Sequence, residues 1–237
     1  MRPSVQTLEV WGDLACFTRP EMKVERFSYP VITPSAARAV FEAIYWKPQF
    51  RWQVTQIELL EPPRYIALRR NEVKGKVPAP RTIEQWRTGK QEPQPLWADG
   101  DDEATGRTQR QTMALKDVRC RLHAEIRPWP DHVAELPALE AQFRRRAARG
   151  QCIYQPYLGC REFPAFFRLL NGEPTQPPTP LDLDLGLMLY DVFDLSRPGG
   201  SADPPSISLF QATVRGGILT VPDYADPAVL KAVKEER

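Results

Sequence analysis

The sequence has little histidine and cysteine and no long apolar run, and these shortages exclude several classes of protein. Its candidates for soft metal ligands are His123, His132, Cys16, Cys120, Cys152 and Cys160. No two cysteines form a C-x-x-C pair, so we expect reduced, mostly buried thiols rather than a zinc site. No apolar run approaches the ~20 residues that span a bilayer, and the N-terminus lacks the apolar core of a signal peptide. We therefore expect a cytoplasmic protein without a membrane partner.

Motifs for nucleotide binding and for familiar hydrolytic centres are also missing. The chain contains neither a Walker loop nor a G-x-G-x-x-G run. Asp182 and Asp184 alternate with leucines, and they could share a divalent cation or form the solvated face of an edge strand. We predict no metal and no other cofactor.

The chain does contain enough apolar residues for a substantial core, and its charge is unevenly distributed. Of its 237 residues 42% are hydrophobic, so it can bury a main domain with a smaller unit packed on it. Basic residues exceed acidic ones by 7 in residues 1–170, whereas acidic residues are in excess by 5 in residues 171–237. The first part could bind a polyanion, or the charges could simply solvate two faces differently.

The first half of the chain predicts a strand, a helix and two further strands. VQTLEVWGDLACF is rich in β-formers, and Ser35 is a candidate N-cap for a helix from Ala36 to about Trp46, which Pro48 stops. The segments RWQVTQIELLE and RYIALRRNEV follow as strands around a proline pair. Residues 73–107 are polar and contain the acidic tract DGDDE, so we expect a surface insertion there.

The second half begins with a strict alternation of apolar and polar residues over 117–126, which predicts a strand with one buried face. A helix should begin near Pro137 and end at Gly150, and the segment QPYLGCREFPAFF should supply one more strand. Near the C-terminus, SLFQATV and ILTVP are joined through Arg215-Gly216-Gly217, which predicts a β-hairpin.

This succession of strands around two helices resembles the ferredoxin-like, or RRM-like, arrangement, whose order is strand, helix, strand, strand, helix, strand. We therefore predict an α+β fold with a ferredoxin-like domain over residues 1–172, interrupted by the insertion at about 73–107. A small antiparallel β-sheet domain and tail should occupy residues 173–237.

Basic residues are concentrated in a way that favours nucleic acid. Guanidinium groups stay charged and present paired donors to phosphate, and several together give salt-dependent binding. Helix-end charge that complements the macrodipole is the alternative, but it accounts for one or two arginines only. The predicted RNA-binding set is Arg19, Lys23, Arg26, Lys47, Arg69, Arg70, Arg144, Arg145, Arg146, Arg149 and Arg161.

Tyr45 lies at the end of the first predicted helix and is followed by Trp46 and Lys47. It could pack on the helix, or its hydroxyl could act in RNA cleavage by the 2′-hydroxyl, which needs proton transfer and charge stabilisation but no metal. A phenol is ionised in only about one part in a thousand at pH 7, so neighbouring cations such as Lys47 would have to assist it.

Several strings in the sequence resemble a known family. These are VWGDLACFTRPEMKVERFSYPVITPSAARAVFEAIYWKP, RRNEV, FRRRAARGQ, LGCREFPA and the late GGI. They resemble the D-subtype of the fifth CRISPR-associated (Cas) protein family, found in type I-C systems. The resemblance covers roughly residues 5–172 and the terminal hairpin.

The resemblance implies a fold and a function. The fold is a ferredoxin-like domain of the RAMP superfamily with an added C-terminal β-sheet. The function is metal-independent cleavage of precursor CRISPR RNA at the repeat hairpin, after which the protein stays on the 5′ handle. Partners would be the repeat RNA, the backbone RAMP subunit and the large subunit of the type I-C complex. The catalytic tyrosine of the family falls on Tyr45.

One part of the family pattern is missing. The family's catalytic Lys-His pair should lie eleven to twelve residues before Gly150, where this chain has Ala138 and Leu139. His132, in the loop just upstream, could replace it. The chain is therefore predicted to be either an endoribonuclease with Tyr45 and His132 as catalytic residues or a binding subunit that cuts slowly or not at all. Double-stranded DNA is a further ligand that the basic face could bind.

Overall fold

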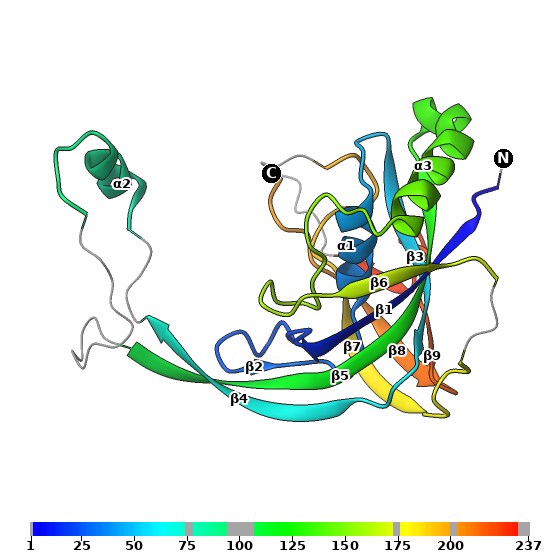
Figure 1. Cartoon of the computed structure of the whole chain (residues 1–237), viewed down its shortest axis with the longest axis horizontal. Coiled ribbons are helices and arrows are strands. Elements are labelled where there is room, and N and C mark those ends of the chain that lie inside the picture. The colour runs from blue at the N-terminus through cyan, green and yellow to red at the C-terminus, as the bar shows by residue number, and fades with distance from the viewer. Residues whose placement is uncertain (1, 74–77, 94–106, 173–175, 200–202, 232–237) are drawn as a thin grey trace.

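The computed structural model describes residues 2–73, 78–93, 107–172, 176–199 and 203–231 (Figure 1). Its strands are β1 (Val5–Ala15), β2 (Arg26–Phe27), β3 (Phe50–Leu59), β4 (Arg64–Val73), β5 (Arg107–Pro128), β6 (Phe166–Leu170), β7 (Leu183–Asp191), β8 (Ser208–Arg215), β9 (Ile218–Thr220) and β10 (Val229–Lys231). Its helices are α1 (Pro34–Ile44), α2 (Pro80–Arg87), the 3₁₀-helix η1 (Pro130–Glu135) and α3 (Leu136–Ala148). This mixture confirms the predicted α+β class.

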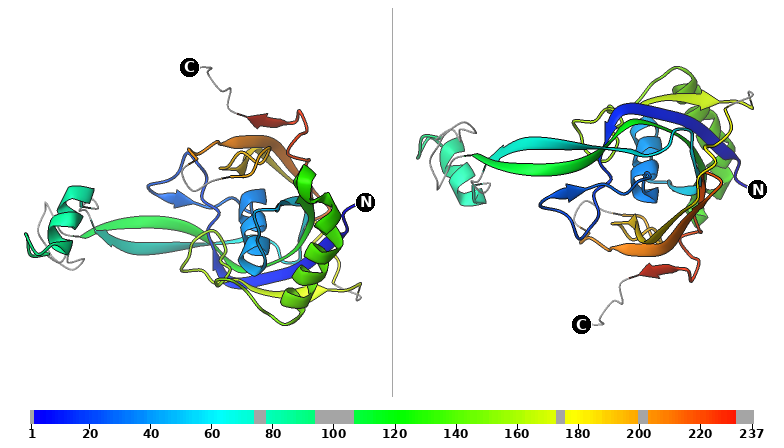
Figure 2. Two further views of the ribbon diagram at one scale, coloured as in Figure 1. Left: turned by 90° about the horizontal axis from the view of Figure 1, so that it is seen from above. Right: turned by 90° about the horizontal axis from the view of Figure 1, so that it is seen from below.

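The strands in the described residues form one large sheet. Its path runs β10-β8-β9-β3-β5-β1-β6, with β2 and β4 paired to β5 and with β7 paired to β8. All of these pairs are antiparallel except β2 with β5. Figure 2 shows that the sheet curls around α1, which lies between the N-terminal and C-terminal strands. α3 covers the sheet beside α1.

The strand β5 connects two parts of the molecule. Residues 118–128 pair with β1 and β3, whereas residues 107–116 pair with β4 and, at Leu115 and Lys116, still with β1. The change comes at Asp117, whose φ of 51° is unusual for a residue with a side chain, although Asp tolerates it better than most. Beyond this point the ribbon of β4 and residues 107–116 of β5 leaves the body as a long arm, with α2 at its far end (Figure 1).

The helix α1 begins earlier than predicted. Thr33, not Ser35, is the N-cap: it has extended backbone angles and its Oγ1 accepts a hydrogen bond from the Ala36 amide at 3.2 Å. Pro34 suits the first helical position because its missing amide would have no partner there. The helix ends at Ile44 rather than Trp46, since Tyr45 is already extended with φ −154°.

The core joins both helices to the sheet. Val40, Phe41 and Ile44 of α1 are buried, and the Phe41 ring lies 4.8 Å from that of Trp52 and 5.8 Å from that of Phe143 on α3. Losing one such ring costs about 3–5 kcal/mol. Leu139, Phe143 and Ala147 are the buried side of α3, as the sequence predicted.

The C-terminal strands continue the same sheet. Gly216 and Gly217, with φ of 54° and 78°, connect β8 to β9 in the predicted hairpin, as both positions of a type I′ turn require. β9 also pairs with β3, and a buried ion pair at 2.7 Å joins Arg38 of α1 to Asp191 of β7. Side chains from β7, β8 and β9 therefore share the core with α1.

The predicted insertion at 73–107 contains a helix that the sequence reading did not foresee. α2 has no buried residue. The acidic tract DGDDE lies outside the described residues. Among the helices that the structure describes, none is long and apolar enough to cross a membrane.

Candidate functional site

Tyr45 is held tightly where α1 ends. Its amide donates to the Phe41 carbonyl at 2.9 Å, and its own carbonyl accepts from the Trp52 indole at 2.9 Å. Tyr45 is only 4% exposed, and its ring lies 5.5 Å from that of Phe50. Tyr45 therefore packs as a core side chain, and its catalytic role stays a prediction.

Two cations lie beside this tyrosine. The Lys47 ammonium is 6.0 Å from the centre of the Tyr45 ring. Arg146 reaches across from α3, and its Nε donates to the Ile44 carbonyl at 2.7 Å. Positive charge at this point favours negative charge nearby, such as a phosphate. The structure thus brings Arg146, which is 102 residues from Ile44 in sequence, to the segment that holds Tyr45 and Lys47.

His132 lies on η1, and backbone hydrogen bonds link the start of η1 to the turn that follows Tyr45. Its amide donates to the Trp129 carbonyl at 2.8 Å, and the Trp129 amide donates to the Gln49 carbonyl at 2.9 Å. The imidazole Nδ1 is 2.6 Å from the Glu135 carboxylate, and the side chain is 36% exposed. An exposed imidazole with a carboxylate partner could accept or release a proton.

The predicted RNA-binding residues fall into two groups. The helix group, near the end of α1 and on α3, comprises Lys47, Arg144, Arg145, Arg146 and Arg149. The arm group, on β2, β4 and the loops around residues 19–23 and 158–163, comprises Arg19, Lys23, Arg26, Arg69, Arg70 and Arg161. Figure 1 shows α3 and the arm on opposite sides of the body.

Several of these arginines have protein partners. In the helix group, Arg144 donates to Gln6 at 3.0 Å and to Ser4 at 2.6 Å, which joins α3 to the start of β1. In the arm group, Arg26 and Arg70 both pair with Glu162. Some of the N–H donors of each of these guanidinium groups are therefore already bound to protein atoms before any ligand binds.

Two cysteines lie beneath the arm group. Gly159, with φ 83°, lets the LGCREFPA loop approach β1 so closely that a Cβ there would lie 2.1 Å from the Cys16 carbonyl oxygen. A hydrogen bond from the Cys160 thiol, together with Thr18 and nearby arginines, lowers the pKa of Cys16 to about 6 against the opposing effect of burial. Arg26 lies 3.3 Å from the Cys160 sulfur. The sequence reading gave these thiols no role beyond packing.

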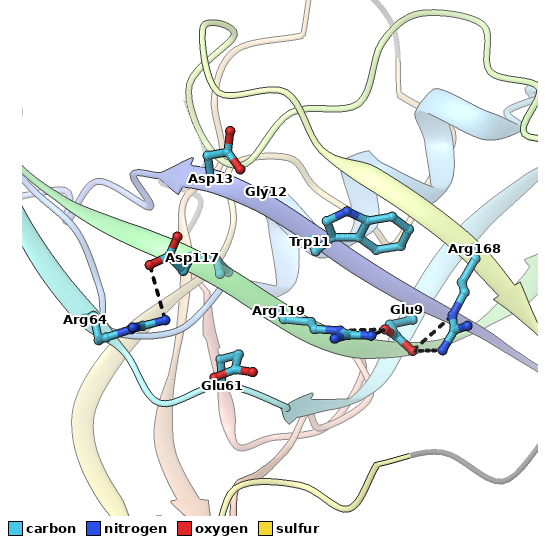
Figure 3. Close-up of a pocket in the computed structure, with 10 residues that line it drawn as sticks. Glu9, Trp11, Gly12, Asp13, Glu61, Arg64, Asp117, Arg119 and Arg168 are labelled. Carbon is cyan, nitrogen blue, oxygen red and sulfur yellow. Dashed lines mark hydrogen bonds and ion pairs between the residues drawn. The ribbon is translucent and has the colours of Figure 1, made fainter.

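A groove of about 510 Å³ lies on the sheet face opposite the helices (Figure 3). Glu9 is buried in it between Arg119, at 2.7 Å, and Arg168, at 2.7 Å. Burial raises the pKa of Glu9, but the hydrogen bonds from the two arginines outweigh it and hold the pKa below its ordinary value. Trp11 and Phe166 stack beside them with ring centres 6.2 Å apart.

The sequence reading missed this groove, although one signal was present. Glu9 and Trp11 are two apart on β1, so they point to the same face of the sheet, and β6 places Arg168 and Phe166 directly opposite them. The described residues contain no cluster of three or more side chains that could hold a metal ion.

The chain matches a known protein family over most of its length. The model of the family described as CRISPR-associated protein (Cas_Cas5) matches residues 7–222. A protein from Thermus thermophilus, named CRISPR pre-crRNA endoribonuclease Cas5d, is 40% identical over 227 residues, which cover 91% of this chain and 90% of that protein. A protein of the same name from Mannheimia succiniciproducens is 38% identical over 224 residues, which cover 92% and 94%.

Solved structures share the fold. One, described as the crystal structure of a CRISPR-associated protein, has a TM-score of 0.64 at 20% identity and covers 97% of this chain and 98% of its own. Another, of a functionally uncharacterized protein from Streptococcus mutans, has a TM-score of 0.62 at 18% identity with the same coverage. The resemblance read from the sequence is confirmed: the chain belongs to the D-subtype of the Cas5 family of CRISPR-associated proteins.

Proposed function

We propose that this protein is a CRISPR pre-crRNA endoribonuclease. The observation that carries the proposal is its 38–40% identity, over at least 90% of their length, to two proteins of that name. It would cut the repeat RNA at its hairpin without a metal and stay on the 5′ handle as part of a type I-C surveillance complex. The backbone RAMP subunit and the large subunit would be its partners there.

The proposed chemistry is attack of the 2′-hydroxyl on the adjacent phosphate. A base removes the hydroxyl proton, the 2′-oxygen bonds to phosphorus, and the bond to the 5′-oxygen breaks as that oxygen receives a proton. Tyr45 and His132 are the proposed proton-transfer residues. Lys47 and Arg146, which flank Tyr45, would stabilise the charge on the phosphorane.

The sheet order supports a ferredoxin-like domain. The strands β6-β1-β5-β3 are neighbours in that order and all antiparallel, and α1 and α3 connect β1 to β3 and β5 to β6. These are the connections and strand order of a split βαβ arrangement, in which the third strand lies between the first and second. We propose that this unit is the RAMP domain of the protein.

A second candidate function is a subunit that binds the RNA handle without cutting it. The positions expected for the Lys-His pair are Ala138 and Leu139, and Leu139 is 2% exposed in the core. Neither side chain can transfer a proton. The low exposure of Tyr45 also favours this alternative. Binding of double-stranded DNA by the basic residues stays a prediction.

An RNA cleavage assay in EDTA separates the two functions. We expect the purified protein to cut its cognate repeat RNA once, and a 2′-deoxy substitution at the scissile position to block the cut. Tyr45→Phe keeps the ring packed on Phe50 and removes only the hydroxyl. It should therefore slow cleavage by about 10²–10⁴-fold, the usual contribution of a general acid or base, with RNA affinity unchanged. His132→Ala should slow cleavage as well.

The variants and the 2′-deoxy substrate distinguish failure of the proposed function from failure of a residue's role or of the mechanism. Tight binding by the wild type with no cleavage would overturn the enzyme and favour the handle-binding subunit. Full activity in Tyr45→Phe would overturn the role of Tyr45 but not the function. Equal cleavage of the 2′-deoxy substrate would overturn the mechanism.

A further inference from the structure

A hollow of about 240 Å³ lies beside the EAIYWKP segment. Glu42, Trp46 and Pro48 of that segment line it, so part of a string that resembles the family forms one of its walls. Phe50 and Arg51 of β3 form another. The cleavage proposal uses Tyr45 and Lys47 of this segment and gives no task to the other three residues.

Aromatic rings face this hollow from three parts of the chain. Trp46 follows α1, Trp129 precedes η1 and Phe193 follows β7. Trp46 is 49% exposed and Phe193 is 50% exposed, although burying rings of this size would be favourable. Exposed aromatic faces around one concavity are what a stacking ligand needs, and a nucleobase stacks on such a ring for about 1–3 kcal/mol.

Polar groups at the same place can meet the edge of a base. Arg51 has a side chain that is 16% exposed, and Asp223 fixes it at 3.6 Å. The Glu42 carboxylate is oriented by Arg38, which is itself buried and paired with Asp191. A carboxylate accepts hydrogen bonds from the amino group of a base, and a guanidinium donates to ring nitrogens and carbonyls. Both kinds of partner therefore line one small space.

The hollow is the right size and in the right place for a single base. Its volume is below the roughly 300 Å³ at which pockets for larger ligands begin, so it excludes a paired duplex. Phe50 lines it on one side and packs on Tyr45 at 5.5 Å on the other. A base held here would place its backbone near the proposed catalytic tyrosine.

We infer that this hollow is a nucleobase pocket, which takes one unpaired base carrying an amino group from the repeat RNA. The base would stack on Trp46 or Phe193, and Glu42 and Arg51 would read its edge. The inference rests on the proposed function, because it assigns a position to part of the same substrate. It adds a specificity site that neither the catalytic residues nor the basic groups supply.

The test combines a protein variant with single abasic substitutions in the repeat RNA. Trp46→Ala should weaken binding of the intact RNA by about 5–150-fold, as the loss of one stacking contact predicts. One abasic position should weaken binding by the wild type to a similar degree and have little further effect in Trp46→Ala. Trp46→Phe retains a stacking face and should restore most of the affinity. Fluorescence of 2-aminopurine at that position should change on binding to the wild type and not to Trp46→Ala.

A matched control removes an equally exposed apolar side chain elsewhere. Leu187 on β7 is 52% exposed, and Leu187→Ala should leave RNA affinity unchanged. If the wild type binds and cuts the RNA but every abasic position affects Trp46→Ala and the wild type alike, the pocket is overturned and the enzyme is not. If Trp46→Ala binds RNA normally and fails only to join its partner subunits, the pocket takes a protein side chain and the inference is wrong. If the wild type neither binds nor cuts repeat RNA, the proposed function fails first.

Discussion

At the scale of single residues, one buried polar network sets a measurable pH dependence. His123 on β5 lies 3.2 Å from the Thr7 hydroxyl and 2.7 Å from the Glu58 carboxylate, which also pairs with Arg121. The Arg121 guanidinium donates to the Gln176 carbonyl at 2.7 Å. The network therefore holds Gln176, which precedes β7, against the sheet.

The pKa of His123 lies below its ordinary value of about 6.5, because burial and the nearby Arg121 outweigh the attraction of Glu58. Protonation therefore disfavours the folded state. The free energy of unfolding should be at its full value above pH 6.5, should fall as the pH drops from 6.5 to the lowered pKa, and should level off below it. His123→Gln cannot be protonated, so its stability should decline less between pH 7.5 and pH 5 than that of the wild type. Urea denaturation at the two pH values measures this, and equal declines would contradict it.

The sequence allowed part of the site to be predicted at this scale. The local sequence pattern predicted that Tyr45 lies at the end of the first helix and that it could pack on that helix. Lys47 lies near Tyr45 because it is only two residues away. The contact of Arg146 with the Ile44 carbonyl could not be predicted, because 102 residues separate the two and no local rule brings α3 to that point.

At the scale of elements, this contact gives α3 a structural role at the end of α1. The last carbonyls of a helix have no partner within it, and Arg146 satisfies one of them with a charged donor. Arg146→Met should therefore lower the free energy of unfolding by about 1.5–3 kcal/mol, the usual contribution of a hydrogen bond to a charged group. Chemical denaturation would measure it.

The neighbouring Arg145 is a matched control. Its side chain is exposed and hydrogen-bonds to Gln142 on the same helix, so Arg145→Met should change stability by no more than about 0.5 kcal/mol. If both variants lose equal stability, the cap on α1 is not the cause. Loss of RNA binding in Arg145→Met without loss of stability would assign that arginine to the ligand.

Element types were easier to predict than their partners. The alternation over 117–126 identified a strand because its period depends on local geometry alone, and Pro137 and Gly150 bounded α3 for the same reason. β3 and β4 are consecutive, but both pair with β5. The pairing of β9 with β3 likewise joins distant segments, and no periodicity in either one predicts it.

At the scale of the whole molecule, the basic residues that look like one set along the chain are divided between the helix group and the arm group. A sequence gives the number of arginines but not their separation, which depends on the bend at Asp117 and on the course of the arm. A single RNA that contacts both groups must cross the body between them. Each group should therefore contribute its own part of the salt dependence of binding.

The arm should be separable from the stability of the body. β4 and β5 end at the paired residues Val73 and Arg107, so residues 74–106 can be replaced by Asn-Gly, which forms a two-residue hairpin turn. None of the residues of α2 is buried. We expect the free energy of unfolding of the shortened protein to be within about 0.5 kcal/mol of that of the wild type, since surface changes away from packed features rarely cost more.

Cleavage gives this experiment its second readout. Tyr45, Lys47 and Arg146 belong to the body, so the shortened protein should still cut repeat RNA if the proposed site is correct. Phe143→Ala, which removes a buried ring from the core, should lose about 3–5 kcal/mol and shows that the denaturation assay detects damage to the body. A shortened protein that loses comparable stability would mean that the residues replaced support the core. One that stays folded but no longer cuts would place part of the substrate on the arm, because the proposed catalytic residues would still be in position.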